Sequence, residues 1–174
     1  MSTAIYPGTF DPITYGHLDL VQRAIKFFDH LVVAVGHNPH KNPPLFSVEE
    51  RVDMIRHVVG TYPQVEVDIF TGLLADHALQ HGVHTIIRSL RTTTEFEAEL
   101  AQAEANRQLN PDLETVFLMP SAEFNYLSST IVREIAQFRG NLTAFVPPHV
   151  EEKLRVKFPM ANREGGKTSG NRNE

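Results

Sequence analysis

The sequence predicts an α/β fold: a doubly wound, Rossmann-like, five-stranded parallel sheet with helices on both faces. Two observations support this prediction. Five short apolar stretches recur without strict polar alternation, as in strands that are buried on both faces. Longer segments with the period of one-sided helices separate them. Such alternation implies right-handed crossovers and a mostly parallel sheet, whose ligands bind beyond the carboxyl ends of the strands.

The apolar stretches define the predicted strands. These are Thr3–Tyr6, Leu31–Val35, Val65–Ile69, Thr85–Ile87 and Thr115–Leu118. The apolar faces of the first two helices carry Leu18, Val21, Ile25 and Phe28, and then Val48, Val52, Ile55 and Val59. Ser47 and Glu50 have the spacing of a capping box, so we expect the second helix to begin there.

Four further helices complete the predicted order. They are expected over Leu73–His81, over Thr94–Leu109 before Asn110-Pro111, from near Ser128, and from after Pro148 to about Phe158. The polar residues 159–174 have no periodicity and predict a disordered tail. We therefore expect a single domain over residues 1–158.

Composition argues against several classes of protein. The chain has 174 residues, of which 41% are hydrophobic and 21% charged, and no apolar run reaches the roughly 18 residues that span a bilayer. A net charge of −5 disfavours broad nucleic-acid binding. Because there is no cysteine and no signal-peptide pattern, we expect a cytoplasmic protein without disulfides.

The loop after the first predicted strand contains groups that suit a phosphate. It reads Gly8-Thr9-Phe10-Asp11-Pro12-Ile13-Thr14-Tyr15-Gly16-His17. Gly8 permits backbone conformations closed to other residues, and Gly16 leaves room for a ligand. His17 lies in the first turn of a helix, where free N–H groups and the helix dipole favour an anion. From spacing alone, a glycine-rich turn followed by a surface histidine explains the pattern equally well.

The loop after the second strand, residues 36–44, is long and stiffened by three prolines. Lys41 in this loop is either a cation that reaches over a phosphate or an exposed surface lysine. His37 and His40 suggest a metal pair. Asn38-Pro39 disfavours a helical His pair, and no third ligand is nearby, so we do not expect zinc there.

Two further loops carry anion-binding groups. Arg88-Ser89-Leu90-Arg91 follows the fourth strand, and its guanidiniums either hold phosphate oxygens or pair with Glu95, Glu97 or Glu99. Ser128-Ser129-Thr130 opens the next helix. Its hydroxyls either form a second anion site with the free N–H groups or simply cap the helix.

The remaining clustered histidines, His77, His81 and His84, lie on or just beyond one predicted helix. Because no acidic or cysteine partner accompanies them, we interpret them as a solvated face and expect no protein-held metal. The predicted loops also contain no Ser-His-Asp arrangement and no obvious pair of catalytic carboxylates. The chemistry therefore needs no protein nucleophile.

These residues resemble the phosphopantetheine adenylyltransferase family, within the nucleotidylyltransferases that carry a Thr/His-x-Gly-His signature. The resemblance covers about residues 3–158. It rests on Gly8–Pro12 with Thr14-x-Gly16-His17, on Arg88-x-Leu90-Arg91, on Asn106-Arg107, and on Ser128–Thr130 with Val132. Related enzymes for nicotinate or nicotinamide mononucleotide usually have histidine at the position of Thr14. The threonine favours the pantetheine branch.

The resemblance implies an enzyme of coenzyme A biosynthesis that transfers AMP from ATP to 4′-phosphopantetheine, giving dephospho-coenzyme A and pyrophosphate. It also implies Mg²⁺ held mainly by the phosphates, a homohexamer, and feedback binding of coenzyme A. The attacking phosphate is largely dianionic at pH 7 because its second pKa is about 6, so no general base is required. Catalysis then consists of positioning and charge stabilisation.

The resemblance also assigns roles to residues. Thr9 and Lys41 would hold the nucleophilic phosphate, and His17 would donate to the α-phosphate as charge builds up. Arg88 would bind phosphopantetheine. Further contacts to its arm would come from Leu74, Asn106 and Glu134. The expected ATP contacts are Thr9, Phe10, His17, Ser89, Leu90, Arg91, Glu99, Phe124, Asn125, Tyr126, Leu127, Ser128, Ser129 and Thr130.

Two positions depart from the family pattern. Ser89 stands where glycine is usual, and its added Cβ would narrow the approach to the nucleotide. Asn125 stands where serine or threonine is common. Two other functions fit the same residues: a non-catalytic adenine-nucleotide-binding domain on this fold, and adenylyl transfer to a different phosphorylated acceptor.

Overall fold

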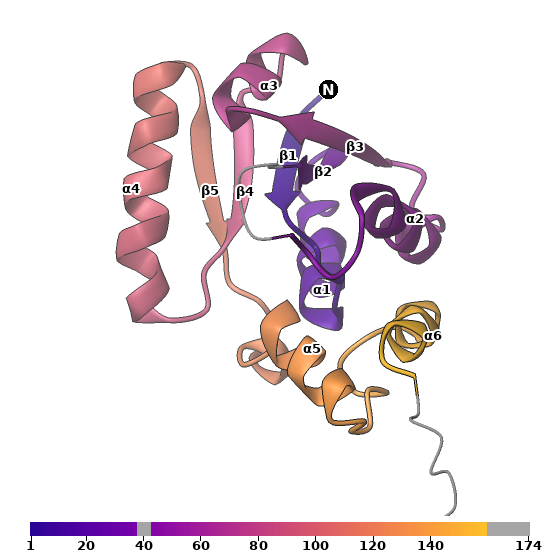
Figure 1. Ribbon diagram of the computed structural model, residues 1–174. Coiled ribbons are helices and arrows are strands. Elements are labelled where there is room, and N and C mark those ends of the chain that lie inside the picture. Colours follow the sequence, from indigo (N-terminus) through magenta and orange to yellow (C-terminus); the bar gives the residue numbers. More distant parts are fainter. Residues whose placement is uncertain (38–42, 160–174) are drawn as a thin grey trace, which may run out of the picture.

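The computed structural model describes residues 1–37 and 43–159. Its strands form one five-stranded parallel sheet in the order β3-β2-β1-β4-β5 (Figure 1). The strands are β1 (Thr3–Gly8), β2 (His30–His37), β3 (Val65–Thr71), β4 (Thr85–Ser89) and β5 (Glu114–Leu118). All five predicted strands are confirmed. The first four run further at their carboxyl ends than the apolar pattern indicates, because backbone pairing does not require an apolar side chain.

The helices also follow the predicted order. They are α1 (Tyr15–Ala24), α2 (Val48–Val59), α3 (Leu74–Gln80), α4 (Thr93–Leu109), α5 (Ser129–Gln137) and α6 (Pro148–Lys157), with a 3₁₀ turn η1 (Ala122–Phe124). The first helix is shorter than predicted. It ends at Ala24, so Ile25 is its C-cap and Phe28 lies beyond it, although both still pack against the core. The predicted tail lies outside the described residues apart from Pro159.

Helices cover both faces of the sheet, as predicted. Along β1, Ala4 and Tyr6 point into a core shared with α1, α2, α5 and α6, whereas Ile5 between them points to the other face. That second core lies under α3 and contains Ala75 and Ala78. Successive side chains of a strand point to opposite faces, so a strand that is apolar throughout must be covered on both. Figure 1 shows α3 and α4 on one side and α1 and α2 on the other, with α5 and α6 below the sheet.

The capping box predicted for α2 is confirmed. The Glu50 N–H donates to Ser47 Oγ at 3.2 Å, and the Ser47 N–H donates to Glu50 Oε2 at 2.8 Å. Glu50 also pairs with Lys157 at 2.9 Å, which links α2 to the end of α6. None of the described helices has the length and apolar character needed to cross a bilayer.

The chain reverses direction across the sheet between β1 and β4. From β1 it winds outward through β2 to β3, and it then returns to β4 on the other side of β1. β1 and β4 are paired at a single register position, Ile5 opposite Ile86. In open α/β sheets this switch point opens a crevice beyond the carboxyl ends of the strands, where ligands bind. The loops after β1 and β4 therefore face a common space.

Candidate active site

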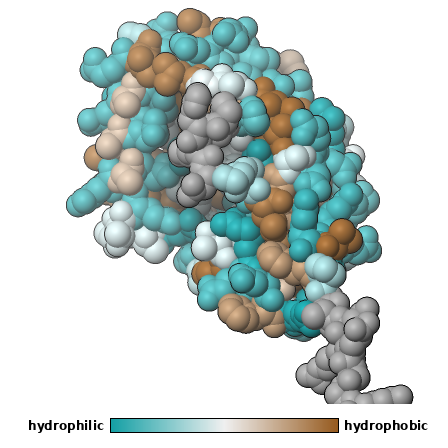
Figure 2. All heavy atoms as spheres, viewed as in Figure 1, coloured by the Kyte–Doolittle hydropathy of each residue, from teal (hydrophilic) through white to brown (hydrophobic). Residues whose placement is uncertain are grey.

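A cavity of about 920 Å³ lies at the carboxyl-terminal edge of the sheet. Its walls come from the segments that follow β1, β3 and β4, from α4, and from residues 120–127. The predicted site residues that line it are Thr9, Phe10, His17, Leu74, Arg88, Ser89, Arg91, Glu99, Asn106, Phe124 and Leu127. The face seen in Figure 2 is mostly hydrophilic, with smaller hydrophobic areas among the polar ones. The size and mixed lining suit a small polar ligand.

The loop after β1 is shaped around the Phe10 side chain. Phe10 is buried and its backbone has φ of 50°, which is uncommon for a residue other than glycine. Its ring packs edge-on against Tyr6 and His17, with centroids 5.4 and 5.1 Å apart. A Cβ on Gly8 would lie 2.8 Å from this ring. The expectation about Gly8 is thus wrong in its reason: the glycine provides space, whereas Phe10 adopts the left-handed backbone.

His17 is held in one tautomer by the start of α1. Its Nδ1 accepts the backbone N–H of N-cap Thr14 at 3.0 Å, and its own N–H donates to Thr14 Oγ1 at 3.4 Å. This is a capping box in which an imidazole takes the usual place of glutamate or glutamine. A nitrogen that accepts a backbone N–H carries no proton, so in the neutral ring the proton resides on Nε2.

The charge state of His17 agrees with this geometry. Burial, reinforced by the nearby Arg91 guanidinium, lowers the pKa of His17 from 6.5 to about 4. At neutral pH the ring is therefore uncharged and offers an Nε2–H donor. Such a donor can stabilise negative charge that develops on a phosphoryl oxygen, and the ring needs no prior change of protonation to do so.

Two buried polar residues that the sequence analysis did not single out shape this end of the cavity. Arg51 on α2 is 2% exposed, and its Nη1 donates to the carbonyl oxygens of Thr9 at 2.6 Å and Gly36 at 3.0 Å. Asp11 accepts the backbone N–H groups of Leu45 and Phe46, both at 2.9 Å. The loop after β1 is thereby tied to the segments on both sides of residues 38–42. Asp11 belongs to the Gly8–Pro12 motif, but the motif does not show that its carboxylate holds the segment at Leu45 and Phe46. Arg51 belongs to no recognised motif.

Arg88 lies in the cavity wall and is paired with Glu99 of α4. Two guanidinium nitrogens donate to the two carboxylate oxygens, each at 2.6 Å, and Nη1 approaches the Pro7 carbonyl at 3.4 Å. This pair joins β4, β1 and α4 across the switch point. The sequence left open whether Arg88 pairs with an acidic residue of the next helix, and the structure shows this pairing. Glu99 was expected to contact ATP, but its carboxylate binds Arg88, the residue expected to bind the acceptor.

Arg91 has a comparable arrangement in the loop between β4 and α4. Its Nη2 donates to Glu95 Oε1 at 2.7 Å, and its Nη1 donates to the Leu127 carbonyl at 2.7 Å. Leu127 ends the segment that begins at Ser121, where the backbone N–H and the hydroxyl are bound by Asp19 of α1 at 2.9 and 2.7 Å. The wall formed by residues 121–127 is therefore fixed from both sides.

The serine and threonine hydroxyls at the start of α5 do not reach the main cavity. Ser128 Oγ caps the helix by accepting the Ile131 N–H at 3.3 Å, as the simpler interpretation of this stretch expects. Ser129 Oγ donates to the Pro12 carbonyl at 2.7 Å. Ser129 and Thr130 line a second, smaller pocket, which shares Thr9 with the main one. Thr9 thus connects the two pockets.

Four other expected residues are placed elsewhere. Leu90, Asn125 and Tyr126 do not line either pocket, and the buried Oδ1 of Asn125 has no hydrogen-bond partner among the described residues. Glu134 is exposed on α5 and likewise lines neither pocket. Lys41 lies outside the described residues.

The interpretation of His77, His81 and His84 as a solvated face is wrong for His77. His77 is 8% exposed, and its Nε2 lies 3.4 Å from Asp68 Oδ2 on β3. His81 also faces Asp68, whereas His84 is exposed beyond the helix. The acidic partner was missed because it comes from an edge strand, nine residues before His77, and only the fold brings the two together.

Comparison with known proteins identifies the family. A model described as cytidylyltransferase-like matches residues 5–135. A phosphopantetheine adenylyltransferase of Syntrophotalea carbinolica is 49% identical over 92% of this chain and 96% of its own. Those of Caldanaerobacter subterraneus subsp. tengcongensis and Hahella chejuensis are each 50% identical, over 91% and 92% of this chain and 98% and 99% of theirs. The chain belongs to the phosphopantetheine adenylyltransferase family. The resemblance drawn from the motifs is confirmed.

The site geometry fits a phosphopantetheine adenylyltransferase family member. Three groups of the cavity wall, His17, Arg88 and Arg91, are donors fixed in place before any ligand binds. Asn106 of α4, which is 4% exposed, adds an amide to the same wall. A preorganised set of donors stabilises developing negative charge without reorganisation during the reaction.

Proposed function

We propose that this chain transfers AMP from ATP to 4′-phosphopantetheine, giving dephospho-coenzyme A and pyrophosphate. The observation that carries the proposal is that His17, Arg88 and Arg91 line one cavity at the switch point of the sheet, in a chain about half identical to enzymes of that name. The acceptor phosphate supplies the nucleophile, so the site needs donors and cations rather than a base.

In this mechanism the protein positions two anionic substrates and stabilises charge. The acceptor phosphate would attack the α-phosphorus in line with the leaving pyrophosphate. Nε2–H of His17 donates to the α-phosphoryl oxygens, and its neutral state keeps that donor available at pH 7. Arg88 binds the acceptor and Arg91 the nucleotide, with Thr9 between the two pockets. Lys41 is assigned to the acceptor phosphate on the resemblance alone.

We further propose that Mg²⁺ accompanies ATP and is held mainly by phosphate oxygens. The two carboxylates among the described residues that line the main cavity, Glu95 and Glu99, are each engaged by an arginine. The donor set therefore fits an ion that enters with its phosphate ligands, which is how Mg²⁺ commonly binds at nucleotide sites. Bound there, the ion neutralises phosphate charge.

Assembly and regulation extend the proposal. We propose a cytoplasmic homohexamer, supported by large apolar side chains that α4 and β5 leave exposed: Phe96, Leu100, Leu109 and Val116. Coenzyme A contains the product as part of its structure, so we propose that it competes for the same cavity. Light scattering tests the assembly, and inhibition by coenzyme A that is competitive with a substrate tests the regulation.

The decisive experiment measures initial pyrophosphate release with ATP, Mg²⁺ and one of three acceptors. We expect release with phosphopantetheine, and only background with nicotinamide mononucleotide or glycerol 3-phosphate. We also expect release to stop when EDTA removes the divalent cation and to return with excess Mg²⁺. ATP binding without release in any mixture would instead establish a non-catalytic nucleotide-binding protein. Faster release with another acceptor would reassign the substrate.

A further inference from the structure

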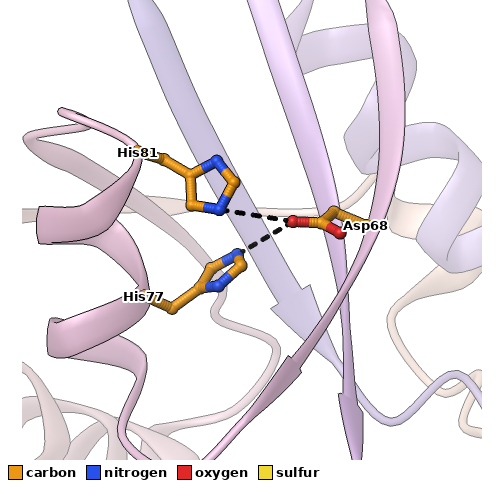
Figure 3. A group of neighbouring side chains, drawn as sticks. All are labelled: Asp68, His77 and His81. Carbon is orange, nitrogen blue, oxygen red and sulfur yellow. Dashed lines mark ion pairs between the residues drawn. The ribbon is translucent and has the colours of Figure 1, made fainter.

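Three potential metal ligands come together between β3 and the end of α3. Figure 3 shows His77 of α3 and His81, the C-cap residue directly after α3, pointing at Asp68 of β3. The Nε2 atoms of His77 and His81 lie 3.4 and 3.5 Å from the same carboxylate oxygen, Asp68 Oδ2. One donor atom from each residue lies within 4.8 Å of the other two. The three atoms therefore surround a common point.

The spacing of these atoms matches the coordination of a small metal ion. Zinc binds imidazole nitrogen and carboxylate oxygen at about 2.0–2.2 Å in a tetrahedron, which separates two ligand atoms by about 3.4 Å. Residues i and i+4 of a helix lie on one face, and the C-cap His81 continues the last turn by donating its backbone N–H to the His77 carbonyl at 3.2 Å, so the end of α3 supplies two ligands. The backbone N–H of Ile69 donates to Asp68 Oδ1 at 2.8 Å, which fixes the carboxylate with Oδ2 toward the imidazoles.

His77 provides a second, independent observation. Its side chain is more than nine-tenths buried, and Nε2 has no hydrogen-bond partner among the described residues. A buried polar atom without a partner is rare and calls for an unseen ligand or another explanation. Burial, and next the neighbouring His81, lower the pKa of His77, although Asp68 opposes the shift. The neutral imidazole is the form that binds metals.

We propose that Asp68, His77 and His81 form a binding site for one divalent transition-metal ion of the zinc type. Two imidazoles and one carboxylate suit Zn²⁺ and its neighbours Co²⁺, Ni²⁺ and Cu²⁺, whereas Mg²⁺ prefers oxygen ligands only. The side chain of His81 is 44% exposed, so the ion can enter from solvent and keep water as its fourth ligand.

The proposed site is separate from the nucleotide-bound Mg²⁺ but adjoins the cavity. The Phe70 ring lies 5.6 Å from the His77 ring and itself lines the cavity, as do residues 71–74 between β3 and α3. An ion held by both elements would fasten this connection. Because it binds the folded chain, it also stabilises the fold in proportion to its concentration and affinity.

The test uses the full chain without a polyhistidine tag, stripped with EDTA and freed of nucleotide. Zn²⁺ is titrated by calorimetry, and bound metal is counted after gel filtration. We expect one ion per chain and a rise in melting temperature on zinc addition. The variants His81→Gln and Asp68→Asn should weaken this binding at least tenfold. His84→Gln, which alters an exposed histidine three residues beyond His81, should bind zinc as the wild type does.

Co²⁺ in place of Zn²⁺ reports on geometry through its visible absorption, which is intense for a tetrahedral ion with nitrogen ligands. We expect that absorption in the wild type and in His84→Gln but not in His81→Gln. His81 is exposed, so His81→Gln should fold normally and decides the question even if Asp68→Asn does not fold. Equal zinc binding by wild type and His81→Gln, or no bound zinc in the wild type, would overturn the proposal.

Discussion

The cavity and the Asp68–His77–His81 cluster differ in whether their polar atoms have hydrogen-bond partners within the chain. In the cavity wall the charged groups have partners within the chain: Arg88 binds Glu99, and Arg91 binds Glu95 and the Leu127 carbonyl. In the cluster, Nε2 of the buried His77 has no hydrogen bond among the described residues. The cavity is thus ordered before a ligand arrives, whereas the cluster has one buried nitrogen without a hydrogen bond beside the half-exposed Asp68 and His81. Internal pairing preserves the geometry of the cavity, and the unpaired Nε2 of His77 is one of the observations on which the proposed metal site rests.

The largest expected effect comes from removing one of the ordered donors of the cavity, the His17 side chain. His17→Ala should lower kcat by about 10²–10³, because one preorganised donor to the developing charge is lost. ATP affinity should change little, since the donor acts mainly in the transition state. Single-turnover kinetics and a separate ATP titration measure the two quantities.

A matched variant separates chemistry from helix capping. His17→Gln keeps a side chain that can accept the Thr14 N–H, and so it should retain the stability that His17→Ala loses, about 1 kcal/mol. Both variants should lose kcat. Near-normal turnover in either would remove the His17 donor from the mechanism.

Replacing Arg51 tests whether the loops that line the cavity depend on its hydrogen bonds to their carbonyl oxygens. Arg51→Met keeps much of the side-chain volume but leaves the Thr9 and Gly36 carbonyl oxygens without their donor. We expect about 2–4 kcal/mol less stability in urea unfolding, since each unpaired buried group costs about 1–3 kcal/mol. Arg56→Met, at an exposed position on the same helix, should cost less than about 1 kcal/mol. Equal losses would show that Arg51 has no special structural role.

The last prediction concerns pH. Because the pKa of His17 is lowered to about 4, the folded ring stays neutral while the unfolded ring takes up a proton near pH 6.5. The contribution of His17 to stability is therefore complete above pH 6.5 and declines as the pH falls toward 4. Nitrogen NMR of the ring should show an unchanged Nε2–H tautomer from pH 8 to 5. A midpoint near 6.5 in the folded protein would contradict the assigned environment.

The sequence predicts the fold and much of the cavity because both depend on local patterns. Apolar runs locate the strands, Ser47 and Glu50 locate a helix start, and loops that follow parallel strands must converge. Arg51 and Asp68 could not be predicted in this way. Each acts on residues far away in the sequence, and a single Arg or Asp within an amphipathic segment is indistinguishable from a solvent-exposed one. The partners of Arg88 and Arg91 could not be assigned from the sequence either, since several glutamates follow closely in the chain.

The capping box at Thr14 has a consequence for how a working imidazole is produced. Of the two neutral forms of His17, only the one with a bare Nδ1 can receive the Thr14 N–H and complete the first turn of α1. Folding of that turn therefore selects the proton position. The same bond that ends the loop and begins the helix leaves each folded molecule with the proton on Nε2, so no separate residue is needed to set the tautomer.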